Sequence, residues 1–222
     1  MKKLFILLTA ALLATNVFAQ TTVTTNITVN TAVPDNDPSG LANAFSLSGL
    51  SGVITNVAVG LNLSGGYNGD LFAYLTGPGG YAVLLNRVGV TSANPNGYGN
   101  TGLAVTFLSG GADIHAYGAG SYSTNAAGQL TGNWGVDGRA ISPLSLGNAF
   151  DLAGRTALLS SFVGASPNGT WGLFIGDYAN GDISTLLNYS VTLTTVPEPG
   201  TLALLAVGGV ALLAGRRKQA VK

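Results

Sequence analysis

Three aspartates have the residue type and spacing that suit metal binding. Asp70 follows an Asn-Gly pair, and Asp177 and Asp182 bracket a Tyr-Ala-Asn-Gly segment between two expected strands. Oxygen-rich loops of this kind can give Ca²⁺ the roughly six to eight carboxylate and carbonyl ligands that it takes. Asp and Asn also occupy turns for local reasons, because their side chains hydrogen-bond the nearby backbone. A calcium site and ordinary turn chemistry are both open from the sequence, and calcium is the one candidate cofactor.

Other reactive residue types do not form a recognisable active site. His115 is the only histidine, and its Gly- and Ala-rich surroundings do not resemble a nucleophile elbow, so we expect a solvent-exposed loop side chain outside any Ser-His-Asp triad. The chain has no cysteine, which excludes disulfides and, with one histidine, a zinc site. Two of the aspartates could serve as a glycosidase acid and nucleophile, but no apolar setting for either is recognisable. The sequence predicts a protein that is not an enzyme.

The N-terminus has the three parts of a secretory signal peptide. Two lysines follow Met1, residues 4–14 are predominantly apolar, and Val17 and Ala19 occupy the small positions before Gln20. We therefore expect signal peptidase to remove residues 1–19 by cleavage between Ala19 and Gln20. Residues 20–195 then form the mature domain.

The C-terminal segment, residues 196–222, combines three features. Val196-Pro197-Glu198-Pro199 ends regular structure because proline lacks a backbone donor. The apolar run at residues 201–215 reaches only about 22 Å as a helix, which is short for a hydrocarbon core of ~30 Å. The run could be a marginal or temporary membrane span, and a buried core helix of a soluble protein is the alternative. The basic cluster Arg216, Arg217 and Lys218 directly after the run favours the membrane segment, with this end held on the cytoplasmic side.

This order of parts resembles the PEP-CTERM sorting signal of bacterial exosortase substrates. The resemblance is confined to the C-terminal segment, residues 196–222. It implies recognition by a membrane-embedded exosortase-type transpeptidase and removal or replacement of the tail. The protein is then expected at the cell envelope, on the outer surface or outside the cell.

The mature domain is acidic. Residues 20–195 contain three arginines, no lysine and eight aspartates, which gives a net charge of −5. A nucleic-acid partner needs clustered Lys and Arg to neutralise phosphates, so this partner class is excluded. Divalent cations are more plausible ligands of this acidic domain than nucleic acids are.

Alternation of apolar residues predicts an all-β domain. The domain has no long helical pattern, and short strands separated by turn residues are typical of a jelly-roll-like β-sandwich. Residues 109–142 lack a clear period, so we expect one or two long surface excursions there. The expected strands are residues 23–33, 44–47, 53–63, 71–75, 81–86, 103–107, 157–162, 171–175 and 187–193. The side chains expected to share the core are Val57, Val59, Leu61, Leu71, Leu103, Val105, Phe107, Trp171, Leu173, Ile175, Val191 and Leu193.

The order of these segments resembles the P domain, or P/Homo B domain, that follows the catalytic domain of subtilisin-like proprotein convertases. The resemblance covers residues 33–195 and implies a jelly-roll fold. In convertases this domain stabilises a protease, and no protease is attached in this sequence, so the resemblance is to an orphan P domain. The segments that carry it are residues 33–36, 56–63, 67–71, 75–80, 84–87, 161–164, 167–173, 176–177, 180–182 and 187–191.

Two function classes remain. The PEP-CTERM resemblance implies a non-enzymatic structural or adhesive protein of the cell envelope or extracellular matrix. The alternative is a carbohydrate-binding module, with or without calcium, that binds extracellular polysaccharide. It would use loop aromatics whose rings stack on sugars, and the candidates are Tyr67, Tyr98, Tyr117, Tyr122, Trp134 and Tyr178. A coplanar row of exposed rings would favour this alternative, and buried rings would favour a structural role.

Overall fold

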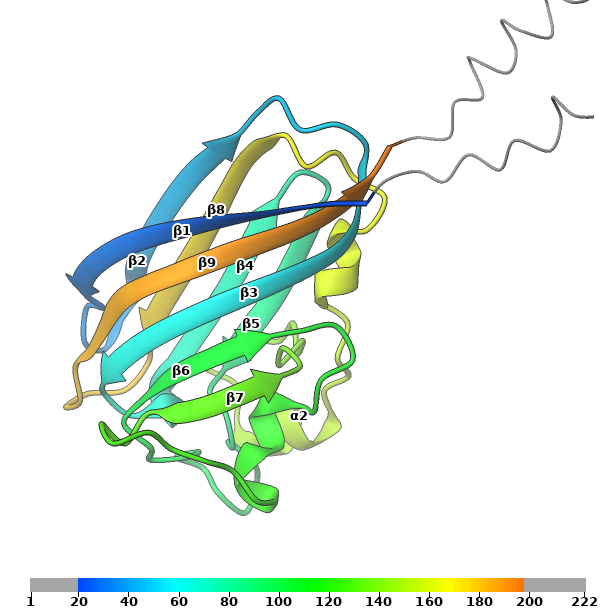
Figure 1. Cartoon of the computed structure of the whole chain (residues 1–222). Helices are drawn as coiled ribbons and strands as arrows, with labels where there is room; N and C mark the ends of the chain where they lie inside the picture. The colour runs from blue at the N-terminus through cyan, green and yellow to red at the C-terminus, as the bar shows by residue number, and fades with distance from the viewer. Residues whose placement is uncertain (1–19, 198–222) are drawn as a thin grey trace, which may run out of the picture. The chain divides into compact units, whose positions relative to one another are not determined.

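The computed structural model describes residues 20–197, which form a β-sandwich of two sheets (Figure 1). One sheet has five strands in the order β1-β9-β3-β6-β7, and the other has four in the order β2-β8-β4-β5. Neighbouring strands are antiparallel except β6 and β7, which are parallel. The predicted all-β sandwich is therefore confirmed. The strands are β1 (Thr21–Ala32), β2 (Asp37–Leu47), β3 (Val53–Gly65), β4 (Leu71–Gly77), β5 (Gly80–Asn86), β6 (Gly102–Phe107), β7 (Leu130–Trp134), β8 (Gly169–Asp177) and β9 (Ser184–Val196).

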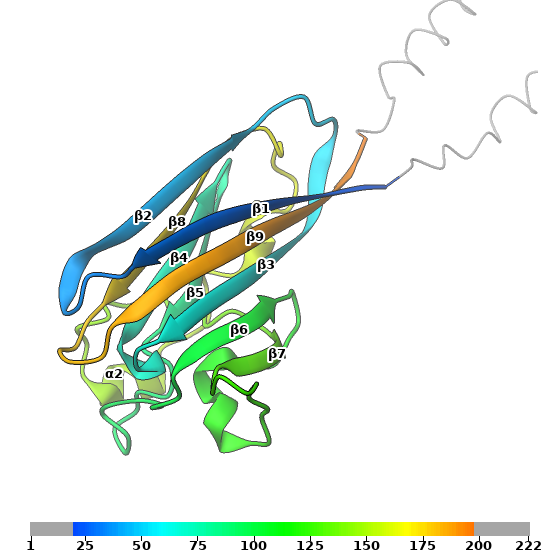
Figure 2. The ribbon, with the colours of Figure 1, turned by 60° about the vertical axis from the view of Figure 1, so that its left-hand side comes forward.

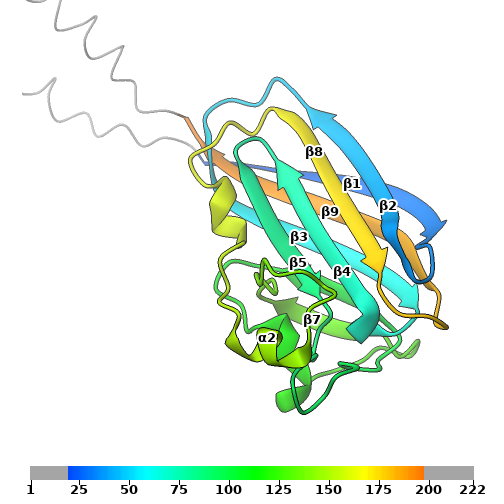
Figure 3. The ribbon, with the colours of Figure 1, turned by 180° about the vertical axis from the view of Figure 1, so that it is seen from behind.

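Short helices occupy the connections between strands. Figures 2 and 3 show α2 at the end of the sandwich opposite to the point where β1 begins and β9 ends. The start of β1 and the end of β9 lie side by side, because Thr21 pairs with Thr195. The helices are η1 (Asn68–Asp70), η2 (Ile114–Ala119), α2 (Gly147–Leu152) and η3 (Leu159–Phe162).

The core lies between the two sheets and is built by strict alternation along the strands. In β8, Trp171, Leu173 and Ile175 are buried, while the residues between them face outward. Every side chain predicted to share the core is buried. The period of two in the sequence was sufficient for this prediction because each inner strand buries one face only.

Trp171 is the largest fully buried side chain. Its indole Nε1 donates a hydrogen bond to the Pro167 carbonyl at 3.1 Å, and its ring packs against Phe162 with centroids 5.0 Å apart. Gly77 leaves room for this ring, since a Cβ there would lie 2.5 Å from Trp171 Cε3. The turn at residues 77–80 therefore needs glycine for close packing.

The register at the start of β3 differs from the sequence prediction. A register shift lies between Ile54 and Asn56, and it turns Ile54 into the core and leaves Thr55 exposed. A β-bulge of this kind adds one residue to one strand and inverts the alternation beyond it. A second shift has the same effect in β9, where Leu186 is buried in place of Leu187.

Two expectations about the middle of the chain were wrong. Residues 109–142 are not only a surface excursion, because they contain β7 and the buried side chains of Ile114, Tyr117 and Val136. Residues 157–162 are not a strand. They form a bend and the helix η3, which lies against β3 and β5 and carries the buried Phe162.

Candidate functional site

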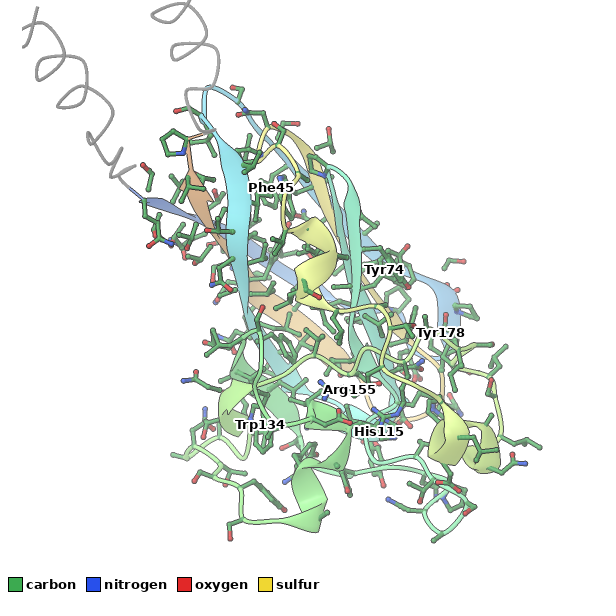
Figure 4. All side chains as sticks on the ribbon, turned by 90° about the vertical axis from the view of Figure 1, so that its right-hand side faces the viewer. Phe45, Tyr74, His115, Trp134, Arg155 and Tyr178 are labelled. Atoms are coloured by element: carbon green, nitrogen blue, oxygen red, sulfur yellow. The ribbon has the colours of Figure 1, made fainter. Side chains whose placement is uncertain are left out.

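The outer face of the four-stranded sheet carries a continuous cluster of aromatic rings. The cluster, which we call the aromatic face, consists of Phe72, Tyr74, Tyr81, Phe174 and Tyr178. Phe72 and Tyr74 alternate along β4 with buried residues, so their rings point away from the core. Figure 4 shows Tyr74 and Tyr178 on the same side of the molecule.

The rings contact one another in sequence across three strands. Tyr74 and Phe174 are stacked, with centroids 4.9 Å apart and an interplanar angle of 18°. On one side the ring of Tyr81 contacts Tyr74, with centroids 5.4 Å apart. On the other side the rings of Phe72 and Tyr178 contact each other, with centroids 6.1 Å apart. Such ring pairs hold one another in place. The cluster is therefore a preformed platform along the sheet.

A shallow hollow of about 200 Å³ adjoins the stacked pair. Small residues, including Ala42, Ala44 and Gly172, line the hollow together with the stacked pair. Thr76 and Asn43 also line the hollow and offer neutral polar groups. The hollow suits a flat, uncharged ligand that lies against Tyr74 and Phe174.

The aromatic face has neutral polar groups and no charged side chain. Partial burial raises the pKa of the Tyr81 hydroxyl, and the neighbouring Tyr74 adds to the effect. The same two causes raise the pKa of Tyr178. Both hydroxyls therefore stay protonated at neutral pH and can donate hydrogen bonds as well as accept them.

The predicted metal ligands lie near one another at the end of β4 and β8. Leu71 and Asp177 are paired across the ladder, and the Tyr178 amide donates to the Asp70 carbonyl at 2.9 Å. Asp177 is fully buried, and its Oδ2 has no hydrogen-bond partner within the described residues. Asp182 is exposed. Within residues 20–197, no group of three or more Asp, Glu, His or Cys side chains is arranged to hold a metal ion.

The carboxyl of Asp70 has an unusual setting that was not recognisable in the sequence. Burial raises its pKa to about 6, and the nearby charges of Asp177, Asp182 and Asp35 add to this, against the opposing charge of Arg87. Burial also raises the pKa of Asp177, with further contributions from Asp35 and Asp182. The carboxylates thus repel one another when they are ionised.

His115 is not the exposed loop side chain that we expected. It is buried, with Nδ1 2.7 Å from Asp137 Oδ2 and Nε2 3.0 Å from the Val90 carbonyl, and its ring stacks on Phe150. A His-Asp pair of this kind is part of a catalytic triad only when the second ring nitrogen faces a nucleophile. Here that nitrogen faces a backbone carbonyl.

The aromatics predicted in loops form a separate cluster. Tyr117 is buried, and the rings of Tyr98, Tyr122 and Trp134 pack around it at 4.5, 5.3 and 6.1 Å. The Tyr117 hydroxyl donates to Asn100 Oδ1 at 3.0 Å. These side chains pack against the domain and do not form an exposed row. Of the loop aromatics named from the sequence, Tyr178 is the one that belongs to the aromatic face.

The signal for the aromatic face was present in the alternation of β4. Phe72 and Tyr74 occupy the positions that should face water, where Thr, Ser or Lys is usual. Tyr81 follows on the next strand of the same hairpin, but Phe174 and Tyr178 come from a segment far along the chain, so the whole cluster could be recognised only once the strand order was known.

Among the solved structures that are similar to this chain are two of a serine protease. One is the serine protease of Aeromonas sobria in complex with its chaperone, at 17% identity and a TM-score of 0.45, covering 85% of this chain and 29% of that one. The other is the serine protease of Aeromonas sobria, at 16% identity and a TM-score of 0.45, with the same coverage. The chain spans less than a third of the length of these proteins. No curated protein is significantly similar to it.

The C-terminal segment matches a known sorting signal. No helix within residues 20–197 has the length and apolarity needed to cross a membrane. The predicted signal peptide, the apolar run and the basic cluster lie outside the described residues. Residues 195–218 match the family model of the PEP-CTERM protein-sorting motif, so the chain carries the signal of an exported protein that an exosortase-type enzyme processes at the cell envelope.

Proposed function

We propose that the chain is a non-enzymatic surface or matrix protein with an adhesive role, and that its P/Homo B-like sandwich binds neutral polysaccharide through the aromatic face. The single observation that carries the proposal is the row of contacting rings on a solvent-facing sheet. Contiguous apolar patches on the surface of a soluble protein often mark a ligand-binding site.

The chemistry of the aromatic face favours sugars over other ligands. The apolar faces of sugar rings can stack on Tyr74 and Phe174, and sugar hydroxyls can bond to Thr76 and the tyrosine hydroxyls. An anionic polymer would need basic side chains. Arg87, Arg139 and Arg155 instead bond to groups of the domain itself.

We propose in addition that Asp70, Asp177 and Asp182 bind Ca²⁺. The mutual repulsion of these carboxylates and the unpartnered, buried Oδ2 of Asp177 support this. Asp182 is exposed, so the turn that carries it would have to bring its carboxylate, or a backbone carbonyl, to the ion.

Affinity electrophoresis of the exported protein in gels containing neutral or acidic polysaccharides tests the adhesive function. We expect retardation by at least one neutral polysaccharide. Tyr74→Ala and Phe174→Ala should each weaken it about tenfold, which corresponds to ~1.4 kcal/mol of binding free energy. Tyr122→Ala is the matched control, because Tyr122 is an exposed aromatic outside the aromatic face. Equal loss in all three variants, or no retardation by any neutral polysaccharide, would refute the proposal.

A further inference from the structure

The two sheets of the sandwich have four edge strands. Within the described residues, these edges are not equally protected from pairing with a strand of another molecule. The edge strands are β1 and β7 in one sheet and β2 and β5 in the other. An unprotected edge presents a row of unpaired N–H and C=O groups, so natural proteins cover edges or interrupt them with proline, charge or bulges.

Two of the edges are covered by other parts of the domain. Along β5, the Val83 amide donates to Ala157 and the Val83 carbonyl accepts from Gly138, at 3.0 and 2.9 Å. The edge strand β7 is short, and the Thr131 amide donates to the Ser123 carbonyl at 2.9 Å. Neither edge is free to pair with another strand over its length.

The third edge, β2, is interrupted at its start. Asp37 and Pro38 open the strand, and a register shift between Asp37 and Leu41 includes Gly40 in the left-handed region at φ +54°. Charge, proline and a bulge each disfavour pairing at a sheet edge. Only residues 41–47 of β2 continue as a regular strand.

The fourth edge, β1, has none of these devices over its regular part. Its 12 residues contain no charged side chain and no proline, and β-branched Thr, Val and Ile dominate the sequence TTVTTNITVNTA. It pairs with β9 in an unbroken register from Thr21 to Thr28. Within residues 20–197 no strand pairs with its other side, and Figure 1 shows it at the margin of the five-stranded sheet. Strands of this composition pair readily.

We propose that β1 is a self-association edge, which pairs antiparallel with β1 of a second copy of this chain and joins the two five-stranded sheets. Two copies related by a two-fold axis present the same surface to each other, so one uncharged edge suffices for both partners. The proposal rests on the sheet edges and is independent of the polysaccharide proposal.

Charge favours a second copy in this orientation. The domain as a whole is acidic, with eight aspartates and three arginines, so most contacts between two copies are repulsive. The β1 edge is uncharged, and its nearest aspartates in sequence, Asp35 and Asp37, follow the strand's C-terminal end. Antiparallel pairing places these aspartates of the two copies at opposite ends of the new ladder. Parallel pairing would bring them together.

The two-sided pattern of β1 restricts the register. Val23 and Ile27 face the core side, and Thr24 and Asn26 face solvent. Directly opposite residues share a face, so outward residues must pair with outward ones. The central register that satisfies this rule places Thr24 opposite Asn26 of the second copy, with Thr25 on the two-fold axis.

Cysteine trapping tests this geometry, because the natural chain has no cysteine. In this register Thr25 lies opposite its own copy, so Thr25→Cys of the exported protein should form a disulfide-linked dimer on mild oxidation. Thr24→Cys and Asn26→Cys should form less of it, because each new cysteine lies diagonal to its copy. Ser46→Cys on β2 is the control and should stay monomeric, since Ser46 is exposed on the other sheet.

A charge exchange tests the same pairing without a covalent link. Like charges directly opposite on neighbouring strands destabilise pairing, and opposite charges stabilise it. The double variant Thr24→Lys, Asn26→Lys and the double variant Thr24→Asp, Asn26→Asp should each sediment as monomers, and a mixture should sediment at twice that mass. The unmodified protein should sediment as a dimer. A monomeric unmodified protein, or dimers that persist in both charged variants alone, would overturn the proposal.

Discussion

His115 and Asp137 form a buried pair, with Nδ1 and Oδ2 2.7 Å apart. The other ring nitrogen, Nε2, lies 3.0 Å from the Val90 carbonyl, so the ring is held at both of its nitrogens. Asp137 also accepts from the Asn86 amide and from Arg139. This network joins segments that precede and follow β6 and β7, and we infer that it organises that end of the domain.

Removal of one partner from this network should be costly. Asp137→Ala should lower the free energy of unfolding by about 3–5 kcal/mol, because it leaves the buried Asn86 amide and the buried His115 ring without their shared partner. Urea melts measure the effect. Asp151→Ala is the control, because Asp151 is exposed and should change stability by less than about 0.5 kcal/mol. Equal, small losses in both variants would show that the network is not a stabilising element.

The core prediction has a simple mutational test. Trp171→Ala removes the largest fully buried side chain and should cost about 3–5 kcal/mol. Tyr81→Ala removes an aromatic ring that is 38% exposed and should cost much less. Denaturant melts of the two variants compare them directly. Similar losses would mean that the aromatic face contributes as much to folding as the core does.

The parts of the fold that sequence reasoning could predict are those set by local alternation. Residues 171–175 bury every second side chain, and this period alone identifies the strand and its inner face. β7 was missed because the strand interior contains Gly132 and Asn133, and the segment becomes a strand through parallel pairing with β6. The β-propensity of these residues does not predict a strand, because the structure of this segment depends on pairing with the distant strand β6.

The candidate site depended still more on distant contacts. His115 is buried because Asp137 and the Val90 carbonyl lie beside it, and neither is near it in the sequence. The aromatic face unites strands that are separated by most of the domain, as with Tyr74 and Phe174. Residue types alone could identify candidate site residues. Which of these residues contact one another depends on the strand order, which the sequence did not reveal.

The sorting segment makes a prediction about localisation. Replacement of Arg216, Arg217 and Lys218 by Gln should release or mislocalise the protein, because these cations hold the C-terminal end on the cytoplasmic side until processing. The amounts of the domain in the envelope fraction and in the culture medium measure the release. Lys222→Gln is the control outside the basic cluster. An unchanged distribution of the triple variant would contradict the role of the cluster.

Asp70 should make stability depend on pH. Burial and neighbouring carboxylates raise its pKa from 3.8 to about 6 in the folded domain, so the folded state binds the proton more tightly than the unfolded chain does. The resulting stabilisation is present below about pH 4 and is lost as the pH rises through about 6. Asp177 changes stability in the same direction, because burial also raises its pKa.

The Asp70→Asn variant imitates the protonated carboxyl and tests this dependence. At pH 7 it should be more stable than the natural domain by about 1–2 kcal/mol, less than the full ~3 kcal/mol for such a shift because solvent screens part of the repulsion. Urea melts at several pH values between 4 and 7 measure the free energy of unfolding. This free energy should change less with pH in the variant than in the natural protein. An unchanged pH dependence would mean that the Asp70 carboxyl is not the group that titrates.

Calcium should offset the same repulsion, if Asp70, Asp177 and Asp182 are its ligands. An ion that binds only the folded state stabilises it by RT ln(1 + [L]/Kd), so calcium at about 100 times Kd should add ~2.7 kcal/mol at pH 7. EGTA should remove this gain, and so should Asp177→Asn or Asp182→Asn. Below about pH 5 the gain should shrink, because protonated Asp70 is a poor ligand. The Asp151→Asn control should respond to calcium as the natural protein does. Identical melts with calcium and with EGTA would identify these aspartates as ordinary turn residues.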